Sequence, residues 1–394
     1  MSDPLNSASQ VLRRESAAMR MAAMSIVVIG MDTFIVQPGF VQGLVEKGGF
    51  SDKEAGYIAA AEMFGIASTT VVMVWLATRA RWRTLAAVAL VMDAAGNLLC
   101  TRAASFDEFV AARFAIGLTS GVLISIGYAV IGGTRNPDRN FGLLIVWVLT
   151  YGALGVFALP SALSLLGLQG VLIALALLAA SGLWVVRYLP DCAATAHGAA
   201  APEYTASPLS AAMLLGAVLC FFLSQGTVWS YLFLIGTAGG AGEQAVANDL
   251  TVAQFLGIAG AFAAATWGSR VRASTSLIGG IGAGVLPMFC FLGAKGAVIY
   301  GVAVSIFNYA ANYITPLLMA VVARGDASGR LIVYAVALQM LGLAIGPALG
   351  AAVISPGDYR HAVLISMGLC VACLALILPP VIRQSRSVMS ASPA

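Results

Sequence analysis

Four ionisable side chains lie inside long apolar runs of this chain, where charges are rare. Asp32 stands in the middle of IVVIGMDTFIVQPGF, and later apolar runs carry Glu62, Asp93 and Arg113. A charged side chain at the centre of a bilayer costs roughly 2.5–3.5 kcal/mol on insertion scales, so it usually faces a polar cavity or a partner. These four residues are therefore the first candidates for chemistry.

An acid and an arginine inside a membrane can handle protons. Burial disfavours the ionised form of a carboxyl and a nearby cation favours it, so such an acid can load and release a proton near neutral pH. Arginine stays protonated in nearly any setting. We predict a proton-coupling site in which Asp32 carries the proton and Arg113 tunes it. Glu62 and Asp93 are predicted as secondary acids.

Each acid also has a structural interpretation, which the sequence leaves open. Asp32 could serve only as the partner of Arg113. Glu62 lies only about two turns into its predicted span and could reach the outer interface. Asp93 could bond to Asn97, which is four residues further along the same helix face.

The second half of the chain carries amides and aromatic rings within its apolar runs. We predict that they line a substrate site together with one glutamine of the first half: Gln37, Gln225, Trp229, Tyr231, Gln254, Asn308, Asn312, Tyr313 and Gln339. Two other interpretations remain open, because amides also bond neighbouring membrane helices and aromatic rings also form interfacial belts. The contrast predicts that the first half handles protons and the second contacts the substrate.

A further group of residues suits movement. The stretch GLAIGPALG places Gly342 and Gly346 four residues apart, and Pro347 follows directly. Small residues let helices approach closely, and a proline removes a backbone hydrogen bond and kinks its helix. With Arg79 and Arg83 of the loop WLATRARWR, they form the predicted gating set.

The elements that must hold these residues are membrane helices. The chain has 394 residues, of which 60% are hydrophobic and 10% charged, whereas soluble proteins carry about 25% charged residues. Hydropathy predicts twelve spans, at 20–45, 55–78, 84–102, 108–132, 141–163, 168–188, 209–236, 247–268, 275–294, 296–322, 330–354 and 361–382.

A polar break divides these spans into two sets of six. The predicted domains are an N-terminal tail at 1–19, a bundle at 20–188, a linker at 189–208, a bundle at 209–382 and a C-terminal tail at 383–394. AEMFGIA at 61–67 matches AQFLGIA at 253–259 in the second span of each half, so Glu62 corresponds to Gln254. Internal repeats are typical of secondary transporters, whose substrate site lies between the repeats near the bilayer midplane.

Lysine and arginine predict the orientation. With the N-terminus in the cytoplasm, most of them fall on the inner side, and the outer side holds Lys47, Lys53, Arg102, Lys295 and Arg360. We therefore predict a multi-pass protein of the cell inner (plasma) membrane with both termini cytoplasmic.

Other function classes have little support. The chain contains no phosphate-binding Walker loop and no H-E-x-x-H. Cys370 and Cys373 form a C-x-x-C inside an apolar helix, where small packing residues are expected instead of a metal or redox site. The net charge of +4 needs no nucleic acid to explain it. We predict no enzyme activity, no metal, no cofactor and no nucleic-acid partner.

The chain resembles the major facilitator superfamily over essentially its whole length. RFAIGLTSG, which begins at Arg113, is similar to the fourth-helix motif of proton-coupled members. MDTFIVQPGF resembles the first-helix motif of the drug–proton antiporters, with Asp32 in the place of the acid. WLATRARWR stands where the loop motif between helices 2 and 3 is found and keeps Arg79 and Arg83, but Thr78 replaces its gating aspartate.

The antiporter motif of helix 5 is incomplete, because Leu159 stands where a glycine would precede Pro160. The resemblance implies an all-α membrane protein, with twelve transmembrane helices in two six-helix bundles related by pseudo-two-fold symmetry around a central cavity. It also implies a working monomer whose bundles rock about that cavity.

We predict a proton-coupled secondary active transporter that moves a small organic molecule across the inner membrane by alternating access. Its partners are the substrate, protons and the lipid bilayer. Efflux of a lipophilic or cationic compound by antiport is preferred to the alternative, proton-coupled uptake of a sugar-like or carboxylated metabolite. A non-transporting membrane sensor or assembly partner is the alternative of another class.

Overall fold

The computed structural model describes residues 16–76, 79–103, 105–134, 136–191, 207–267, 272–293, 296–324 and 330–391. Most of the predicted N-terminal tail and of the predicted linker lies outside these residues. The described regular structure consists of helices, with one isolated bridge between Ser355 and Asp358. The helices are α2 (Ala17–Gly30), α3 (Asp32–Ile35), α4 (Gln37–Glu46), α5 (Asp52–Leu76), α6 (Trp82–Cys100), α7 (Phe106–Gly132), α8 (Pro137–Val186), α9 (Pro208–Ala238), α10 (Glu243–Trp267), α11 (Ala273–Phe291), α12 (Ala297–Arg324), α13 (Arg330–Val353) and α14 (Arg360–Ala391).

Ten of the described helices are long and apolar enough to cross a membrane. One of them, α8, has 50 residues and changes direction at Gly167, whose φ of 66° is readily adopted only by glycine. It therefore supplies both the fifth and the sixth predicted span. The first predicted span consists of the three short helices α2, α3 and α4. The long helices and this broken one together account for the twelve predicted spans.

The first span has two breaks, at Met31 and at Val36, and the second has a chemical cause at Pro38. Proline has no backbone N–H, so the carbonyl four residues earlier loses its helical donor. That carbonyl belongs to Phe34, and it accepts a hydrogen bond from Trp229 Nε1 of α9 at 3.2 Å instead. The helix breaks on either side of the four residues of α3, which include Asp32.

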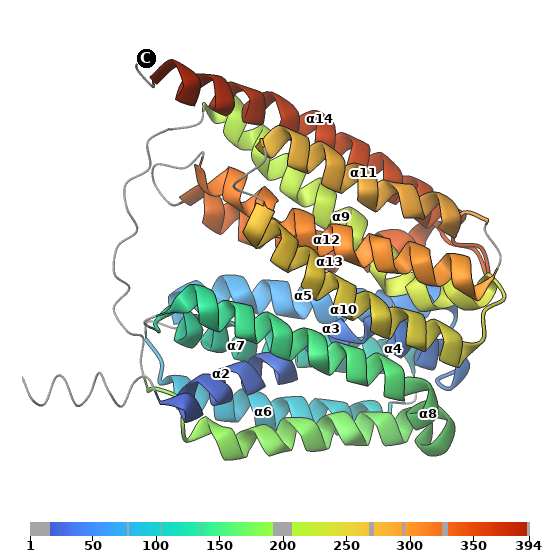
Figure 1. The fold of residues 1–394 in the computed structure, drawn as a ribbon. Helices are drawn as coiled ribbons and strands as arrows, with labels where there is room; N and C mark the ends of the chain where they lie inside the picture. Colours follow the sequence, from blue (N-terminus) through green and yellow to red (C-terminus); the bar gives the residue numbers. More distant parts are fainter. Residues whose placement is uncertain are drawn as a thin grey trace, which may run out of the picture.

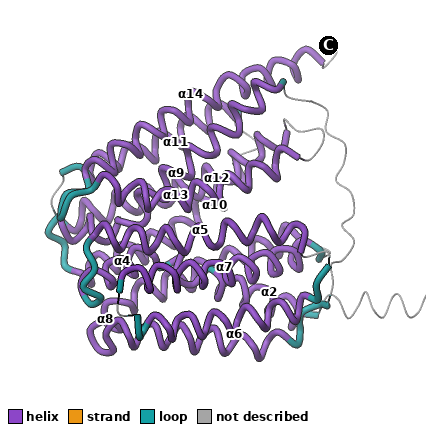
Figure 2. Tube along the Cα trace, turned by 180° about the vertical axis from the view of Figure 1, so that it is seen from behind, coloured by secondary structure: helices purple, strands orange, loops and turns teal. Residues whose placement is uncertain are grey.

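The helices pack as two groups (Figures 1 and 2). In the first half, α7 packs against α2, α5 and α6, and α6 packs against α8. In the second half, α9 packs against α13 and α14, and α12 packs against α10 and α11. The halves meet where α5 contacts α13, α8 contacts α10 and α4 contacts α9. The fold therefore has the arrangement expected of two helical bundles with a shared interface.

The bundles are joined closely at one end, which we call the sealed end. Asp52 Oδ2 at the start of α5 accepts hydrogen bonds from Tyr359 Oη at 2.8 Å and from the Gly357 N–H at 3.3 Å, in the loop before α14. Gln244 of α10 donates to the Phe157 carbonyl of α8 at 3.4 Å. At the opposite end, where α2 begins and α14 ends, the two groups of helices diverge (Figure 1).

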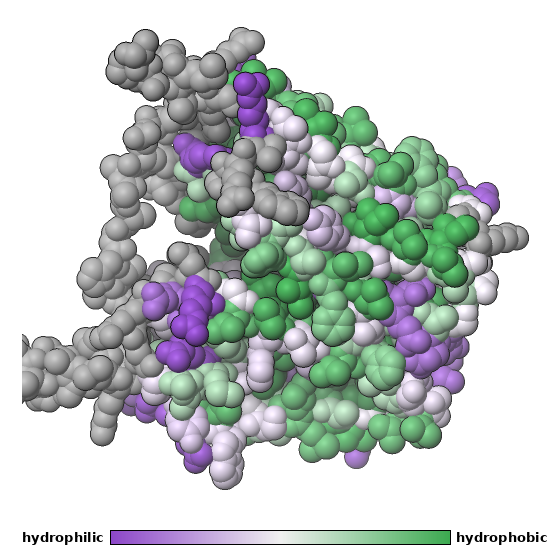
Figure 3. All heavy atoms as spheres, viewed as in Figure 1, coloured by the Kyte–Doolittle hydropathy of each residue, from purple (hydrophilic) through white to green (hydrophobic). Residues whose placement is uncertain are grey.

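Apolar side chains cover much of the outside of the molecule. Leu154, Trp184, Phe262 and Val298 are among the large hydrophobic residues that are exposed. Figure 3 shows hydrophobic residues over the middle of one face and hydrophilic residues toward its two ends. Such a surface suits the hydrocarbon of a bilayer rather than water.

Candidate functional site

Arg113 is the centre of a buried polar cluster in the first half. It lies on α7 and its side chain is 0% exposed. Its Nε donates to Glu62 Oε2 of α5 at 3.0 Å, and its Nη2 forms an ion pair with the same oxygen. Its guanidinium also lies 4.9 Å from the centre of the Phe40 ring. The structure therefore pairs Arg113 directly with Glu62, so Glu62 faces the protein interior and not the outer interface.

The close approach of α5 and α7 makes this pair possible. Gly65 and Gly117 face each other, because a Cβ atom on Gly65 would lie 2.8 Å from Gly117 Cα. Larger residues at these positions would push the helices apart and separate Glu62 from Arg113.

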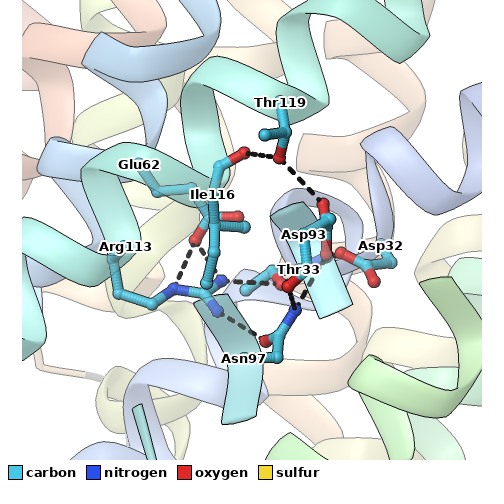
Figure 4. A network of polar contacts seen from close by, with 8 residues as sticks. All are labelled: Asp32, Thr33, Glu62, Asp93, Asn97, Arg113, Ile116 and Thr119. Carbon is cyan, nitrogen blue, oxygen red and sulfur yellow. Dashed lines mark hydrogen bonds and ion pairs between the residues drawn. The ribbon is translucent and has the colours of Figure 1, made fainter. Parts of the chain in front are cut away.

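Asp32 joins the cluster through Thr33. Arg113 Nη2 donates to Thr33 Oγ1 at 2.8 Å, and Thr33 Oγ1 donates to Asp32 Oδ1 at 3.1 Å (Figure 4). The backbone N–H of Thr33 also donates to Asp32 Oδ1, at 2.5 Å. Asp32 Oδ2 is buried and has no hydrogen-bond partner among the described residues. One oxygen of Asp32 is thus held, and the other is left for a proton or a ligand.

Asp93 of α6 joins the cluster through Asn97 and lies beside Asp32 (Figure 4). Asn97 Nδ2 donates to Asp93 Oδ1 at 2.9 Å, as their spacing predicts, and Asn97 Oδ1 accepts from Arg113 Nη1 at 3.1 Å. Thr119 Oγ1 lies 3.3 Å from Asp93 Oδ2. We call these residues the arginine cluster: Asp32, Thr33, Glu62, Asp93, Asn97, Arg113 and Thr119. It contains three carboxyl groups and one cation.

The second half holds a neutral counterpart, the amide cluster of Gln254, Asn308 and Asn312. Asn308 Nδ2 of α12 donates to the Ala253 carbonyl at 2.8 Å and to Gln254 Oε1 of α10 at 3.3 Å. Asn312 Nδ2 donates to Asn308 Oδ1 at 3.1 Å. Gly257 permits this contact, because a Cβ atom there would lie 2.8 Å from Asn312 Nδ2.

The amide cluster opens into a cavity of about 200 Å³ between the two halves. Six residues of the predicted substrate set line it: Gln225, Trp229, Gln254, Asn308, Asn312 and Gln339. Phe34 and Ile35 of the first half form part of its wall. Every lining residue that the structure describes is uncharged. We call this space the amide cavity.

Three residues of the predicted substrate set lie elsewhere. Gln37 is buried at the interface of the halves and accepts from Ser230 Oγ at 3.1 Å. Tyr231 lies near the sealed end, where its hydroxyl donates to the Pro347 carbonyl at 3.1 Å and its ring stacks on Tyr359. Tyr313 stacks on Tyr309 and lines a separate cavity of about 300 Å³ beside α11.

The predicted gating glycines pack two helices of the same half. A Cβ atom on Gly346 of α13 would lie 2.6 Å from Thr227 N of α9, and Thr227 Oγ1 donates to the Gly346 carbonyl at 3.0 Å. Gly342 faces α9 in the same way, because its Cβ would lie 2.9 Å from Leu223 N. Pro347 follows within α13. These contacts hold α13 against α9.

The predicted gating arginines lie at the end of the molecule where the bundles diverge. Arg79 lies over the Trp75 ring, 4.0 Å from its centre. Arg83 Nε donates to the Leu189 carbonyl at 2.5 Å, and Arg83 Nη1 lies 3.4 Å from Asp191. Arg83 thus connects the start of α6 to the residues after α8.

Sequence reasoning missed the hydroxyl groups of the site. Thr33 and Thr119 connect the acids of the arginine cluster, and Ser230 binds Gln37. Thr33 had a signal, because it belongs to the Asp-Thr pair of the first-helix motif. Thr119 and Ser230 had none, since a threonine or serine within an apolar helix usually bonds to its own backbone.

Comparison with known proteins places this geometry in a family. The model of the Major Facilitator Superfamily matches residues 22–329. A mutant of the nucleoside transporter NupG superposes with a TM-score of 0.73 at 12% identity, with 93% of this chain and 100% of that chain covered. The D-xylose–proton symporter gives a TM-score of 0.71 at 14% identity, with coverage of 92% and 98%.

A bacterial homologue of the human lysosomal transporter Spinster, inward-facing and unoccupied, gives a TM-score of 0.62 at 15% identity, and both chains are covered completely. No curated protein matches the chain by sequence. At such identities the solved structures show the fold alone, and none of these matches singles out the drug–proton antiporter branch. The family model covers most of the chain and agrees with the helical membrane fold, so the protein belongs to the Major Facilitator Superfamily, a family of transporters rather than enzymes.

Proposed function

We propose that the protein couples proton movement to the transport of a small, uncharged organic molecule, with Asp32 as the proton carrier. As a member of its family it is a multi-pass secondary transporter of small molecules. The observation that carries the proposal is the arginine cluster, in which one guanidinium serves three buried carboxyl groups. Phe34 and Ile35 of α3, the helix that also carries Asp32, form part of the wall of the amide cavity.

The number of charges supports proton binding by this cluster. Arg113 pairs with Glu62, so Asp32 and Asp93 have no direct ion pair among the described residues. An unpaired buried charge is costly, and a carboxyl group avoids that cost by holding a proton. A second conformation that brings Asp32 closer to Arg113 would favour release of the proton.

Asp32 is also well placed to sense the substrate. Met31 and Phe34 flank the Asp32–Thr33 pair, and both line cavities between the halves. A ligand that moves α3 would change the distance from Asp32 to Arg113 by way of Thr33. Binding and protonation would thus be coupled through one short helix.

The lining of the amide cavity favours a lipophilic ligand over a cationic one. Its described wall combines Trp229 and phenylalanine rings with neutral amides, and no carboxylate faces it. Lipophilic compounds cross bilayers unaided, so a transporter for them gains most by pumping outward. We therefore propose efflux by proton antiport. Amides also suit hydroxyl groups, which makes uptake of a sugar-like metabolite the second candidate.

Proton flux in inside-out vesicles tests this proposal. A dye in the lumen reports the imposed pH gradient while cations, neutral drugs, sugars and organic acids are added in turn. We expect some neutral compounds to dissipate the gradient with the wild type but not with Asp32→Asn. Asp107→Asn is the matched control, because Asp107 is an exposed acid on the same helix as Arg113, and it should behave as the wild type. Equal dissipation by Asp32→Asn and the wild type would refute the role of Asp32.

A further inference from the structure

A second, larger cavity continues from the amide cavity toward the outside of the bundle. It has a volume of about 620 Å³ and lies between the first part of α8, α10 and α12. The two cavities share wall residues, namely Ile35, Leu149, Asn312 and Thr315. They therefore form one continuous space with two chemically different ends.

The larger cavity has an apolar wall. Isoleucine, leucine, valine, alanine and phenylalanine side chains form most of it, and Asn312 and Thr315 lie where it meets the amide cavity. Its volume falls within the range of ~300–1,000 Å³ that is typical of ligand sites. We call it the side cavity.

The side cavity reaches the apolar outer surface. Phe262 of α10 lines it and is 70% exposed, and Ile145 and Val146 of α8 line it and are 41% and 42% exposed. The neighbouring Leu143 and Trp147 are exposed as well. Residues 142 and 262 lie five residues from the ends of their helices, roughly 8 Å along the axis. The mouth thus lies at the depth of one leaflet.

Gly142 marks an open part of the mouth. It lines the side cavity, and a Cβ atom added to it would meet no other atom within 4 Å. A larger side chain at this position can therefore extend into open space without displacing the described structure. Tyr128 and Phe141 stand at the same end of the cavity, with their ring centres 5.7 Å apart.

We infer that the side cavity holds the apolar chain of an amphipathic ligand that enters from the bilayer, while its uncharged, hydrogen-bonding head group occupies the amide cavity. This inference rests on the proposed function and names the class of its substrate. The two ends of the connected cavities match the two ends of such a ligand. The side cavity has an apolar wall for the chain, and the amide cavity has neutral amides for the head group. Entry from the bilayer keeps the apolar chain of the ligand away from water. Each methylene group exposed to water would lower the fraction of ligand in water about fourfold.

Binding of a neutral single-chain lipid to the protein in nanodiscs tests this inference. The probe is radiolabelled 1-monodecanoylglycerol, whose glycerol head is uncharged and bonds well to amides. The wild type should bind it saturably. Gly142→Phe should weaken binding at least tenfold, because its ring occupies the mouth. Gly282→Phe is the matched control, since Gly282 is a helical glycine of α11 that also faces open space, and its affinity should equal that of the wild type.

A second variant guards against failed folding. Ala261→Phe fills the side cavity from α10, the opposite wall, and should weaken binding as well. Equal affinity of the wild type and a folded Gly142→Phe or Ala261→Phe variant would overturn the inference, and so would the absence of saturable binding to the wild type. The assay contains no proton gradient, so failure of proton coupling through Asp32 would leave its result unchanged.

Discussion

The two halves of this transporter hold polar groups on corresponding pairs of helices, but the polar groups differ in their chemistry. In the first half, α5 and α7 bring Glu62 and Arg113 together as an ion pair. In the second half, α10 and α12 bring Gln254 and Asn308 together as neutral amides. Glu62 and Gln254 occupy equivalent positions in the two matching sequences. Gly65 permits the close contact of α5 with α7, and Gly257 at the equivalent position leaves room for the amides of Asn308 and Asn312.

This difference supports the proposed division of tasks between the two halves. A buried ion pair depends on both of its charges, because removing one leaves the other unpaired, at about 3–5 kcal/mol. Interhelical hydrogen bonds between neutral groups in membrane proteins average ~0.6 kcal/mol. The first half can therefore respond strongly to the loss or gain of a proton, while the second can exchange its hydrogen bonds with a ligand at little cost.

Removal of the cation should break the comparison most severely. Arg113→Leu leaves Glu62 buried without a partner, so we expect the free energy of unfolding in mixed micelles to fall by about 3–5 kcal/mol. The double variant Arg113→Leu/Glu62→Leu should recover most of this loss. A double variant as unstable as the single one would show that packing around Arg113 matters more than its charge.

A carboxyl group placed in the second half should make that half sensitive to pH. Gln254→Glu puts an acid beside Asn308 without a nearby cation among the described residues. Its protonated form can replace the amide, but its ionised form is unpaired, so stability should fall by about 1–3 kcal/mol as the pH rises. Thermal unfolding at several pH values measures this effect. Gln169→Glu, which alters an exposed glutamine of α8, should show no such dependence.

Loss of an amide should matter less than loss of the arginine. Asn308→Leu removes the bonds to the Ala253 carbonyl and to Gln254. We expect the free energy of unfolding to fall by about 0.6 kcal/mol, and by no more than ~1.7 kcal/mol. A loss as large as that of Arg113→Leu, measured in the same micelles, would contradict the difference between the halves.

The smallest effect on the protein is expected at the sealed end, where Glu46 of the first half lies beside Glu243 of the second half. Partial burial and the neighbouring Glu243 of α10 raise the pKa of Glu46, the last residue of α4, above its usual range, while Lys47 and Gln42 act in the opposite direction. The raised pKa means that the closed contact binds a proton more readily than the separated one. Closure is therefore favoured at low pH and weakens as the pH rises through the raised pKa.

Spin labels at Lys53→Cys and Gly242→Cys measure this contact as a distance between the two halves at the sealed end. The distribution should lengthen slightly from acidic to alkaline pH, and Glu46→Gln should remove that change. An unchanged pH response in Glu46→Gln would assign it to another group.

The sequence was sufficient to predict the helices and the charged residues of the arginine cluster, but not its hydroxyl groups. Long apolar runs leave few alternatives to membrane helices, and charges within them must find partners. It was not sufficient to predict that Arg113 pairs with Glu62 instead of Asp32. That pairing depends on the contact of Gly65 with Gly117, which is a property of three-dimensional packing.

The predicted substrate set contains residues that lie on different faces of the same helix. Successive helical residues are about 100° apart, so Tyr231 points roughly 200° from Trp229, and Tyr313 roughly 100° from Asn312. Trp229 and Asn312 line the amide cavity, while Tyr231 and Tyr313 do not. Proximity in sequence grouped residues that the helical period places on different surfaces.

The most direct test of the account is infrared spectroscopy of the purified protein as its pH is varied, because the carbonyl stretch of a protonated carboxyl group differs from the bands of a carboxylate. We predict a titrating band from protonated carboxyl groups in a dry environment that is clearly weaker in Asp32→Asn than in the wild type, because only the contribution of Asp93 remains. The band should persist in Asp107→Asn. The same titrating band in the wild type and in Asp32→Asn would show that Asp32 does not carry the proton, and would contradict the central claim.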